Sequence, residues 1–325
     1  MTRLNELRLI ARVAQMYHVE HQRQSTIASH LRISQATISR MLKRAQEEEI
    51  VRTTVVSPSG IYSDLEEGLR LKYDIKEAIV VECSEDRDGA IMSRIGEAAA
   101  HFVEATLQPD EIIGVSSWSE TVLKMVENIH PLKLGRAKYV VQTLGGMGDP
   151  TVQMHANHLT TRLAKLTGAE PRMLSAPGVA QSREAKLVLL GDSYLRATMD
   201  LFSKITLAIV GVGTVAPSDM LARSGNVFTS HELSAVQEAG GTGDISLRFF
   251  DAHGNPIKSA LDDRVIGMTL EELAKVDRVI AVAGGHSKTP AIHGALKSKV
   301  IDLLITDKFT AERLVTGAIK HDEGD

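Results

Sequence analysis

The first fifty residues place apolar side chains at helical spacing in three short segments. Residues 4–19 form the first segment, and residues 24–44 (QSTIASHLRISQATISRMLKR) hold two more that are joined by a tight turn. Residues three and four apart share one face of a helix, so each segment predicts an amphipathic helix and the three faces can form one core. The apolar positions are Leu4, Leu7, Ile10, Ala11, Ala14 and Tyr17, then Ile27, Ala28 and Leu31, and then Ile38, Met41 and Leu42.

The outer face of the third predicted helix carries groups that suit a DNA groove. Ser34 stands just before this helix, where its hydroxyl can accept a hydrogen bond from an unpaired backbone N–H. Amide, hydroxyl and guanidinium groups meet base edges and phosphates in a major groove. The sequence therefore predicts a helix-turn-helix that binds DNA, with a helical hairpin facing only water as the alternative. The candidate DNA contacts are Ser34, Gln35, Ala36, Thr37, Ser39, Arg40, Lys43 and Arg44.

The turn and the exit of this motif each leave a choice open. Arg32 stands in the turn where such motifs usually have glycine, so it either adopts a left-handed backbone at some cost or forms a different turn. After the motif, residues 50–56 (IVRTTVV) are β-branched enough for a strand. That strand is either the wing of a winged motif or a simple exit strand.

A turn-forming stretch at residues 57–60 (SPSG) predicts a domain boundary, because it breaks both helix and strand. A chain of 325 residues also exceeds a typical single domain. We therefore expect a DNA-binding domain at 1–56 and a ligand-binding and oligomerisation domain at 57–325. The helix expected over residues 62–73, capped by Asp64, either pairs with a second copy or packs on its own domain.

Beyond residue 75 the pattern changes to short apolar strands that alternate with helices. This pattern is typical of a mostly parallel sheet that is covered on both faces. We therefore expect an α/β domain of the Rossmann-like, doubly wound type, whose ligands bind at the carboxyl ends of the strands. The expected strands are 78–81, 112–115, 139–143, 205–210, 245–250, 279–282 and 300–306, with helices at 92–107, 120–129, 290–297 and from 310 onward.

Glycine and hydroxyl residues gather in the loops that follow four of these strands. Glycine lets backbone N–H groups approach a ligand, and a following helix adds its positive end. The loops therefore predict a site for a small anionic or sugar-like molecule, with Lys288 as a phosphate-binding cation and Asp244 and Asp251 as acceptors for sugar hydroxyls. The loops are 114–121 (GVSSWSET, with Ser116, Ser117, Ser119 and Thr121), 142–149 (QTLGGMGD), 211–214 (GVGT) and 283–289 (AGGHSKT).

Several of these stretches have plainer interpretations. Residues 211–216 (GVGTVA) satisfy a dinucleotide fingerprint, but Pro217 follows where the phosphate-binding helix should continue, so we expect no nicotinamide and no other cofactor. The glycines at 240, 241 and 243 are interpreted as a flexible turn before the strand at 245–250, and a solvated surface lysine is the alternative for Lys288. His155 and His158 have metal-like spacing but no companion ligand, so no metal site is predicted.

The distribution of charge confines DNA contact to the first domain. Residues 1–60 hold nine lysines and arginines against five acidic residues, a net +4, which leaves 28 against 36, or −8, for the rest. Only the basic part attracts a polyanion. Cys83 is the one cysteine and is expected to be a buried small residue, and no apolar run approaches the roughly 20 residues that span a bilayer. With no secretion signal in view, we expect a cytoplasmic protein that does not bind membranes.

Over nearly its whole length the chain resembles the SorC family of sugar-responsive bacterial transcriptional regulators. The resemblance implies a domain related to phosphosugar isomerases and deaminases, which binds a phosphorylated sugar or polyol as the effector that alters operator binding. It also implies homo-oligomers, usually dimers that pair into tetramers. The segments that carry it are QSTIASHLRISQATISRML, GVSSWSETV, VVQTLGGMG, AIVGVGT, GDISLRFFDAHGN and VIAVAGGHSKTPAIHGALKSKVIDLLITDKFTAERLV.

The same resemblance implies which residues meet the effector. Where relatives often have a glycine-containing turn, this chain has Ser117 and Trp118, so both join the candidates. Trp118 is the only tryptophan, and it is either an aromatic wall against a sugar face or an indole that packs in the core. The contacts implied by motif are Ser116, Ser119, Gly145, Gly146, Gly211, Gly213, Asp244 and Lys288.

Two functions therefore stand at this point. The first is a transcriptional regulator that binds operator DNA, senses a sugar phosphate or polyol and controls genes of carbohydrate catabolism. The alternative is a phosphosugar isomerase or deaminase with an accessory head. An isomerase needs a general base beside a ring-opening acid, and the loops show no gathered set of Asp, Glu and His residues for these roles. The sequence therefore favours a regulator that is not an enzyme.

Overall fold

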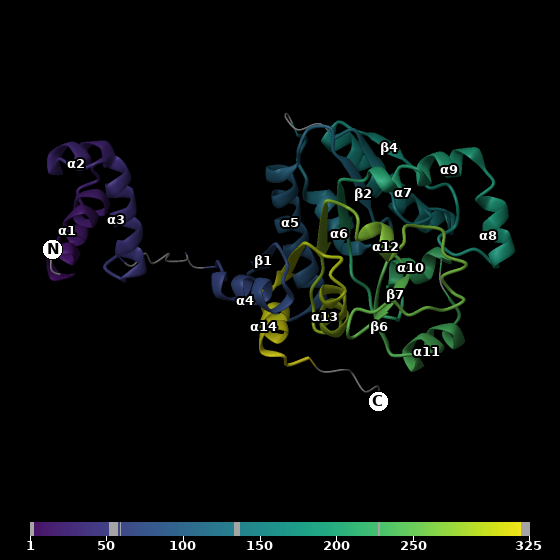
Figure 1. The fold of residues 1–325 in the computed structure, drawn as a ribbon. Helices are drawn as coiled ribbons and strands as arrows, with labels where there is room; N and C mark the ends of the chain where they lie inside the picture. The colour runs from purple at the N-terminus through teal and green to yellow at the C-terminus, as the bar shows by residue number, and fades with distance from the viewer. Residues whose placement is uncertain (1–2, 52–57, 59, 133–136, 227, 320–325) are drawn as a thin grey trace. The chain divides into compact units, whose positions relative to one another are not determined.

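The chain forms two compact units, Met1–Pro58 and Ser59–Asp325, which we describe separately. The computed structural model describes residues 3–51, 58, 60–132, 137–226 and 228–319 of the 325 residues. Figure 1 shows the first unit as helices only and the second as a sheet with helices around it.

Three helices form the first unit: α1 (Arg3–His18), α2 (Gln24–Leu31) and α3 (Gln35–Glu47). Their apolar faces pack together as the spacing of the sequence predicts, except that Leu4, Ala11 and Tyr17 of the first helix are exposed. The fully or largely buried side chains of this core are Ile10, Val13, Ala14, Met16, Ile27, Ile38, Leu42 and Ala45. The unit therefore orients the remaining face of α3 toward solvent.

The turn between α2 and α3 is fixed by local hydrogen bonds. Arg32 adopts a left-handed backbone, with φ 55° and ψ 41°, so the first of the two turn alternatives is the one observed. The Ser34 hydroxyl accepts a hydrogen bond from the backbone N–H of Thr37 at 3.1 Å, which caps α3 as expected. The proposed strand or wing at residues 50–56 lies mostly outside the described residues.

Seven strands of the second unit form one parallel sheet, in the order β1-β9-β8-β5-β2-β3-β4. Alternate residues of a strand face opposite sides, and in β5 Leu207 and Ile209 join one buried cluster while Ala208 and Val210 join another. The sheet is therefore covered on both faces. The strands are β1 (Glu77–Val81), β2 (Ile112–Val115), β3 (Tyr139–Gln142), β4 (Glu170–Arg172), β5 (Leu207–Val210), β8 (Arg278–Val282) and β9 (Leu303–Asp307).

Helices supply the two layers that cover this sheet. On one face lie α5 (Asp88–Thr106), α6 (Glu120–Asn128) and α7 (Pro150–Thr167). On the other lie α4 (Ser63–Tyr73), α13 (Thr289–Lys297) and α14 (Lys308–Thr316). The mixed α/β class and the doubly covered parallel sheet were both predictable from the alternation of apolar strands and helices.

Helix α4 packs on its own unit, since it contacts β1 and α14 and buries Leu69 and Tyr73. Its first residue follows Tyr62, which has no side-chain cap, so the expected cap at Asp64 is wrong and Asp64 lies within the first turn. None of the helices in the described part of the chain is long and apolar enough to cross a membrane.

The expected single strand at residues 245–250 is wrong. An antiparallel hairpin, β6 (Gly241–Ile245) and β7 (Arg248–Asp251), occupies this region instead. Two of the glycines that were interpreted as a turn lie in β6, and the turn consists of Ser246 and Leu247, both with positive φ of 54° and 63°. The pattern GTGDI of β6 has too few apolar side chains to predict a strand.

Short elements between β4 and β8 also escaped prediction, because their few residues give no periodicity. They lie in the segments that connect these strands. These elements are α8 (Arg183–Leu189), α9 (Ser193–Met199), η1 (Phe202–Lys204), α10 (Asp219–Ser224), α11 (Ser230–Glu238) and α12 (Leu270–Leu273).

We predict that Ser34→Ala destabilises α3 by about 1 kcal/mol, because the Thr37 N–H loses its side-chain acceptor. Amide hydrogen exchange at the first turn of α3 in the full-length chain measures the change. Ser34→Asp keeps an acceptor at the cap and should preserve the protection. Equal loss of protection in both variants would show that the cap contributes nothing.

Candidate functional site

The strand order places a switch point between β2 and β5. From β2 the chain continues outward through β3 to β4, and from β5 it continues in the opposite direction through β8 to β9. At such a point the loops that leave the carboxyl ends of two neighbouring strands separate and open a crevice, where ligands of α/β proteins bind.

A cavity of about 210 Å³ lies at this switch point. It is smaller than the roughly 300–1,000 Å³ typical of sites for drug-sized ligands, which suits a molecule no larger than a monosaccharide. The loops after β2 and β5 form two of its walls, and the hairpin β6–β7 and the start of α13 close it. The polar and glycine residues that line it include Ser116, Ser119, Glu120, Gly211, Gly213, Thr214, Ser218, Asp244, Ser246 and Lys288.

Two glycines allow these walls to approach each other. A Cβ at Gly211 would collide with the hydroxyl of Ser119, and a Cβ at Gly213 would collide with the carboxylate of Asp244. Gly213 also exchanges two backbone hydrogen bonds with Asp244, at 3.0 and 2.9 Å. The hairpin is therefore fastened directly onto the loop after β5, with the Asp244 side chain beside the cavity.

The carboxyl group of Asp244 lies in a partly buried position beside the cavity. Burial raises the pKa of Asp244 to about 6, although the N–H of Leu247 and the charge of Lys288 both favour the ionised form. The Leu247 N–H donates to Oδ2 at 2.7 Å, so one carboxylate oxygen is fixed by the hairpin turn. The other oxygen can accept a hydrogen bond from a ligand.

Lys288 provides the positive charge of the cavity. It stands at the N-cap of α13, so the residue lies at the positive end of a helix, and it lines the cavity. Within the described part of the chain, the Lys288 ammonium donates no hydrogen bond to a protein group, and its side chain is only partly exposed. An ammonium in this position can bind an anionic group of a ligand.

Trp118 has both of the roles that the sequence left as alternatives, a core-packing indole and an aromatic wall. Its indole N–H donates to the carbonyl of Gly145 at 2.8 Å, and the residue is only 5% exposed, so it packs in a buried cluster. The same side chain also lines the cavity. It therefore forms a rigid aromatic wall.

Three of the candidate effector residues lie outside this cavity. Ser117 is fully buried, and its hydroxyl has no hydrogen-bonding partner among the described residues. Gly145 pairs its N–H with the carbonyl of Ile266 at 2.9 Å, and Gly146 lies against the side chain of Gln142. These two glycines follow β3, and their loop contributes Leu144 to the lining of the cavity but not the glycines themselves.

Several cavity residues were missed by the sequence interpretation. Ser218 caps the short helix α10, and Ser246 sits in the hairpin turn with its hydroxyl 3.5 Å from that of Ser116. Neither belongs to a glycine-rich loop. Only the hairpin, which the sequence did not predict, could have located Ser246.

The other candidate groups do not gather at the cavity. Asp251 lies in a turn, where its carboxylate accepts hydrogen bonds from Asn255 and from the N–H of His253. His155 and His158 are exposed on α7, and the described residues contain no group of three or more potential metal ligands. Cys83 is buried as expected, and burial raises the pKa of its thiol to about 11.

The candidate DNA contacts divide into two groups on α3. Ser34, Gln35, Ala36, Ser39, Arg40 and Lys43 are exposed, and Thr37 is half-buried. Arg44 instead forms ion pairs with Glu6 of α1 and with Glu48, so it holds α3 against α1. The Arg40 guanidinium makes one long contact of 3.3 Å, to the Thr37 hydroxyl, which leaves most of its donors accessible.

We predict that Asp244→Asn stabilises the protein more at pH 7.5 than at pH 5. The native pKa of about 6 exceeds the ordinary value of 3.8, so the native carboxyl keeps a proton that the unfolded chain has released. Stability therefore falls as pH rises through this window and stays lower above it. Asparagine carries no charge but keeps an acceptor for Leu247. Thermal unfolding at the two pH values measures the difference.

Asp251→Asn is the matched control for this pH dependence. Burial acts to raise the pKa of Asp251, but hydrogen bonds from Asn255 and His253 outweigh it and hold the pKa below its usual range. Asp251 is therefore ionised at both pH values, and its replacement should change stability equally at each. A pH-independent effect of Asp244→Asn would contradict the raised pKa.

Comparison with known proteins agrees with these features. Residues 58–316 match the family model described as "Putative sugar-binding domain". The deoxyribonucleoside regulator of Bacillus subtilis (strain 168) is 32% identical over 302 residues, which cover 93% of this chain and 95% of that protein. The sorbitol operon regulator of Klebsiella pneumoniae is 28% identical over 316 residues, which cover 97% and 100%.

A solved structure extends the similarity to the fold. The crystal structure of the full-length sorbitol operon regulator SorC from Klebsiella pneumoniae aligns with a TM-score of 0.70 and 28% identity. The alignment covers 95% of this chain and 98% of that one. These relatives are regulators of transcription and not isomerases, which sets the enzyme alternative aside. The chain belongs to the SorC family of sugar-binding transcriptional regulators.

Proposed function

We propose that this regulator senses a phosphorylated sugar or polyol in the cavity at the switch point and binds operator DNA through α3. The observation that carries the effector assignment is the pairing of Lys288 with Asp244 across one small cavity. An ammonium and helix N-terminus bind a phosphate, while a carboxylate accepts hydrogen bonds from hydroxyl groups. A sugar phosphate or a polyol phosphate carries both kinds of group.

Seven of the candidate residues remain effector contacts in this proposal, because they line the cavity. Ser116 and Ser119 supply hydroxyl groups, Gly211 and Gly213 allow close approach, and Trp118 forms the aromatic wall. Relatives are named for a deoxyribonucleoside and for sorbitol, so the class of effector that we propose is consistent with their names. The control of carbohydrate catabolism genes follows from the same class.

DNA recognition is assigned to a helix-turn-helix domain at residues 1–56, which lies within the first unit. The exposed side chains of α3 offer amide, hydroxyl and cationic groups in one row, and the charge of this part of the chain is positive. Residues 57–325 bind the effector and form a homo-oligomer, a dimer or a tetramer, because symmetric operators require symmetric proteins. We infer from this role that the protein acts in the cytoplasm.

A thermal-shift screen of the purified chain tests the effector assignment. The panel contains pentose, hexose and hexitol phosphates, the corresponding free compounds and inorganic phosphate. A ligand that binds only the native state raises the melting temperature by mass action. No shift with any phosphorylated compound at millimolar concentration would refute the assignment.

We predict that Lys288→Gln weakens binding of the phosphorylated sugar by about ten- to one-hundredfold, since a charge-assisted hydrogen bond is lost. Binding of the free sugar should change by less than about threefold, because the hydroxyl-binding end at Asp244 is intact. Calorimetric titration of both compounds measures the two ratios. Equal weakening of the binding of the two compounds would show that Lys288 does not bind the phosphate.

We predict that Arg40→Ala weakens specific operator binding by about ten- to one-hundredfold without affecting effector binding. Arg87→Ala removes the same charge from an exposed position in the second unit and serves as the control. Fluorescence anisotropy with the DNA upstream of the regulated genes measures both variants. Unchanged DNA affinity of Arg40→Ala would exclude α3 as the reading helix.

A further inference from the structure

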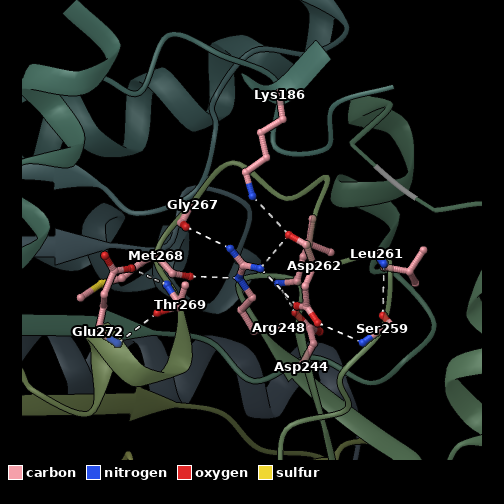
Figure 2. A network of polar contacts seen from close by, with 11 residues as sticks. Lys186, Asp244, Arg248, Ser259, Leu261, Asp262, Gly267, Met268, Thr269 and Glu272 are labelled. Carbon is pink, nitrogen blue, oxygen red and sulfur yellow. Dashed lines mark hydrogen bonds and ion pairs between the residues drawn. The ribbon is translucent and has the colours of Figure 1, made fainter. Parts of the chain in front are cut away.

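Arg248, at the start of β7, is a buried cation whose hydrogen bonds all go to one loop. Its Nε donates to the carbonyl of Met268 at 3.3 Å, and one terminal nitrogen donates to the carbonyl of Gly267 at 3.2 Å. The other terminal nitrogen contacts the carbonyl and the carboxylate of Asp262, at 3.2 and 3.1 Å. Figure 2 shows the guanidinium between the Gly267–Met268 backbone and Asp262.

These contacts leave little capacity for binding a ligand directly. A guanidinium has five N–H donors, and four contacts already engage all three nitrogens of Arg248. Its side chain is 8% exposed. Arg248 also lies outside the lining of the effector cavity. Its chemistry therefore serves the protein and not a bound anion.

The loop that Arg248 holds is attached to another wall of the cavity. The N–H of Met268 donates to the carbonyl of Thr143 at 2.7 Å, and the carbonyl of Ile266 accepts from Gly145 at 2.9 Å. Gly145 in turn accepts the indole N–H of Trp118. A continuous set of hydrogen bonds therefore runs from Arg248 through this loop to the aromatic wall.

Arg248 is also connected through the hairpin to Asp244, the acidic residue of the cavity. Arg248 pairs with Ile245 across the hairpin, and Ile245 follows Asp244 directly. The turn between them holds Ser246 and Leu247 in left-handed conformations, which for residues with side chains cost free energy and persist only when their surroundings enforce them. The four contacts of Arg248 provide such enforcement at the base of this turn.

We propose that Arg248 is a positioning residue of the effector site, which fixes the distance between Asp244 on the hairpin and Trp118 on the opposite wall. The proposal rests on the proposed function, because that distance determines which hydroxylated molecule fits the cavity. The same carbonyl of Asp262 also accepts a hydrogen bond from Lys186 of α8 at 3.3 Å. The Asp262 carbonyl therefore joins the contacts of Arg248 to α8, which has no buried residue.

The test uses Arg248→Lys in the full-length chain without ligand, so that it does not depend on identifying the effector. Lysine keeps the charge but cannot span the three carbonyls as a planar fork does. Arg278→Lys is the matched control, because Arg278 is also partly buried and contacts the carbonyl of Thr106 and the carboxylate of Glu111. Arg278 begins β8, at the end of the sheet away from the cavity.

Two measurements are made on each variant. Hydrogen exchange follows the amides of Leu247, Gly145 and Met268, and the emission of Trp118, the only tryptophan, reports on the aromatic wall. We expect Arg248→Lys to accelerate exchange at these three amides by about tenfold or more and to shift the emission of Trp118. Arg278→Lys should change neither. Unchanged exchange and emission in Arg248→Lys, or equal changes in both variants, would overturn the proposal.

Binding measurements then separate positioning from simple loss of structure. Inorganic phosphate needs only Lys288, so its weak affinity should survive in Arg248→Lys, whereas a phosphorylated sugar that also needs Asp244 should bind about tenfold more weakly. Asp262→Ala removes only the side-chain part of the contact and should give a smaller change in the same direction. Equal loss of phosphate and sugar phosphate would indicate general disruption and refute positioning. If no sugar phosphate binds the parent chain, the proposed function fails, while exchange and emission still decide the role of Arg248.

Discussion

Two backbone hydrogen bonds between Gly213 and Asp244 are the constraint on which the cavity at the switch point depends. They join a hairpin that lies outside the main sheet to a loop that leaves its centre. This junction places the Asp244 carboxylate beside the loop after β5, in the cavity that Lys288 also lines. The absence of a side chain at Gly213 is essential, since any Cβ there would occupy the place of the Asp244 carboxylate.

The cavity that results is electrostatically asymmetric. Lys288 enters from the start of a helix that covers one face of the sheet, while Asp244 enters from the hairpin, and burial keeps the pKa of the carboxyl near 6. A ligand that donates a hydrogen bond to Asp244 favours its ionised form. Binding of a polyhydroxylated anion and ionisation of this carboxyl are therefore linked, as any two processes that share a group must be.

The sequence was sufficient to predict the central strands and the helices α6, α13 and α14, because β2, β5 and β8 are continuous apolar runs and α13 and α14 show helical spacing. It could not predict the hairpin, since β6 has no apolar pattern and its turn uses Ser246 and Leu247. A left-handed pair of this kind is uncommon for residues that carry side chains. Local propensity carries no sign of it.

The sequence also indicated seven of the residues that line the cavity, but it did not show which loops lie next to one another. The order of strands in the sheet decides which loops are neighbours, and no single loop contains that information. The loop after β3 resembles the others in composition, yet it contributes Leu144 to the cavity lining, while the carbonyl of Gly145 accepts the indole N–H of Trp118. Ser117 was misplaced for a different reason, because the direction of one side chain in an irregular loop depends on packing.

The construction of the cavity from separate loops has an evolutionary consequence. The lining residues come from the loops after β2, β3 and β5, from the start of α10, from the hairpin and from the residue before α13, and none of them belongs to a strand of the seven-stranded sheet. Each segment can change independently while the scaffold and the DNA-facing helix stay the same. A lineage of such proteins can therefore acquire a new inducer by a few substitutions at one rim and retain its operator.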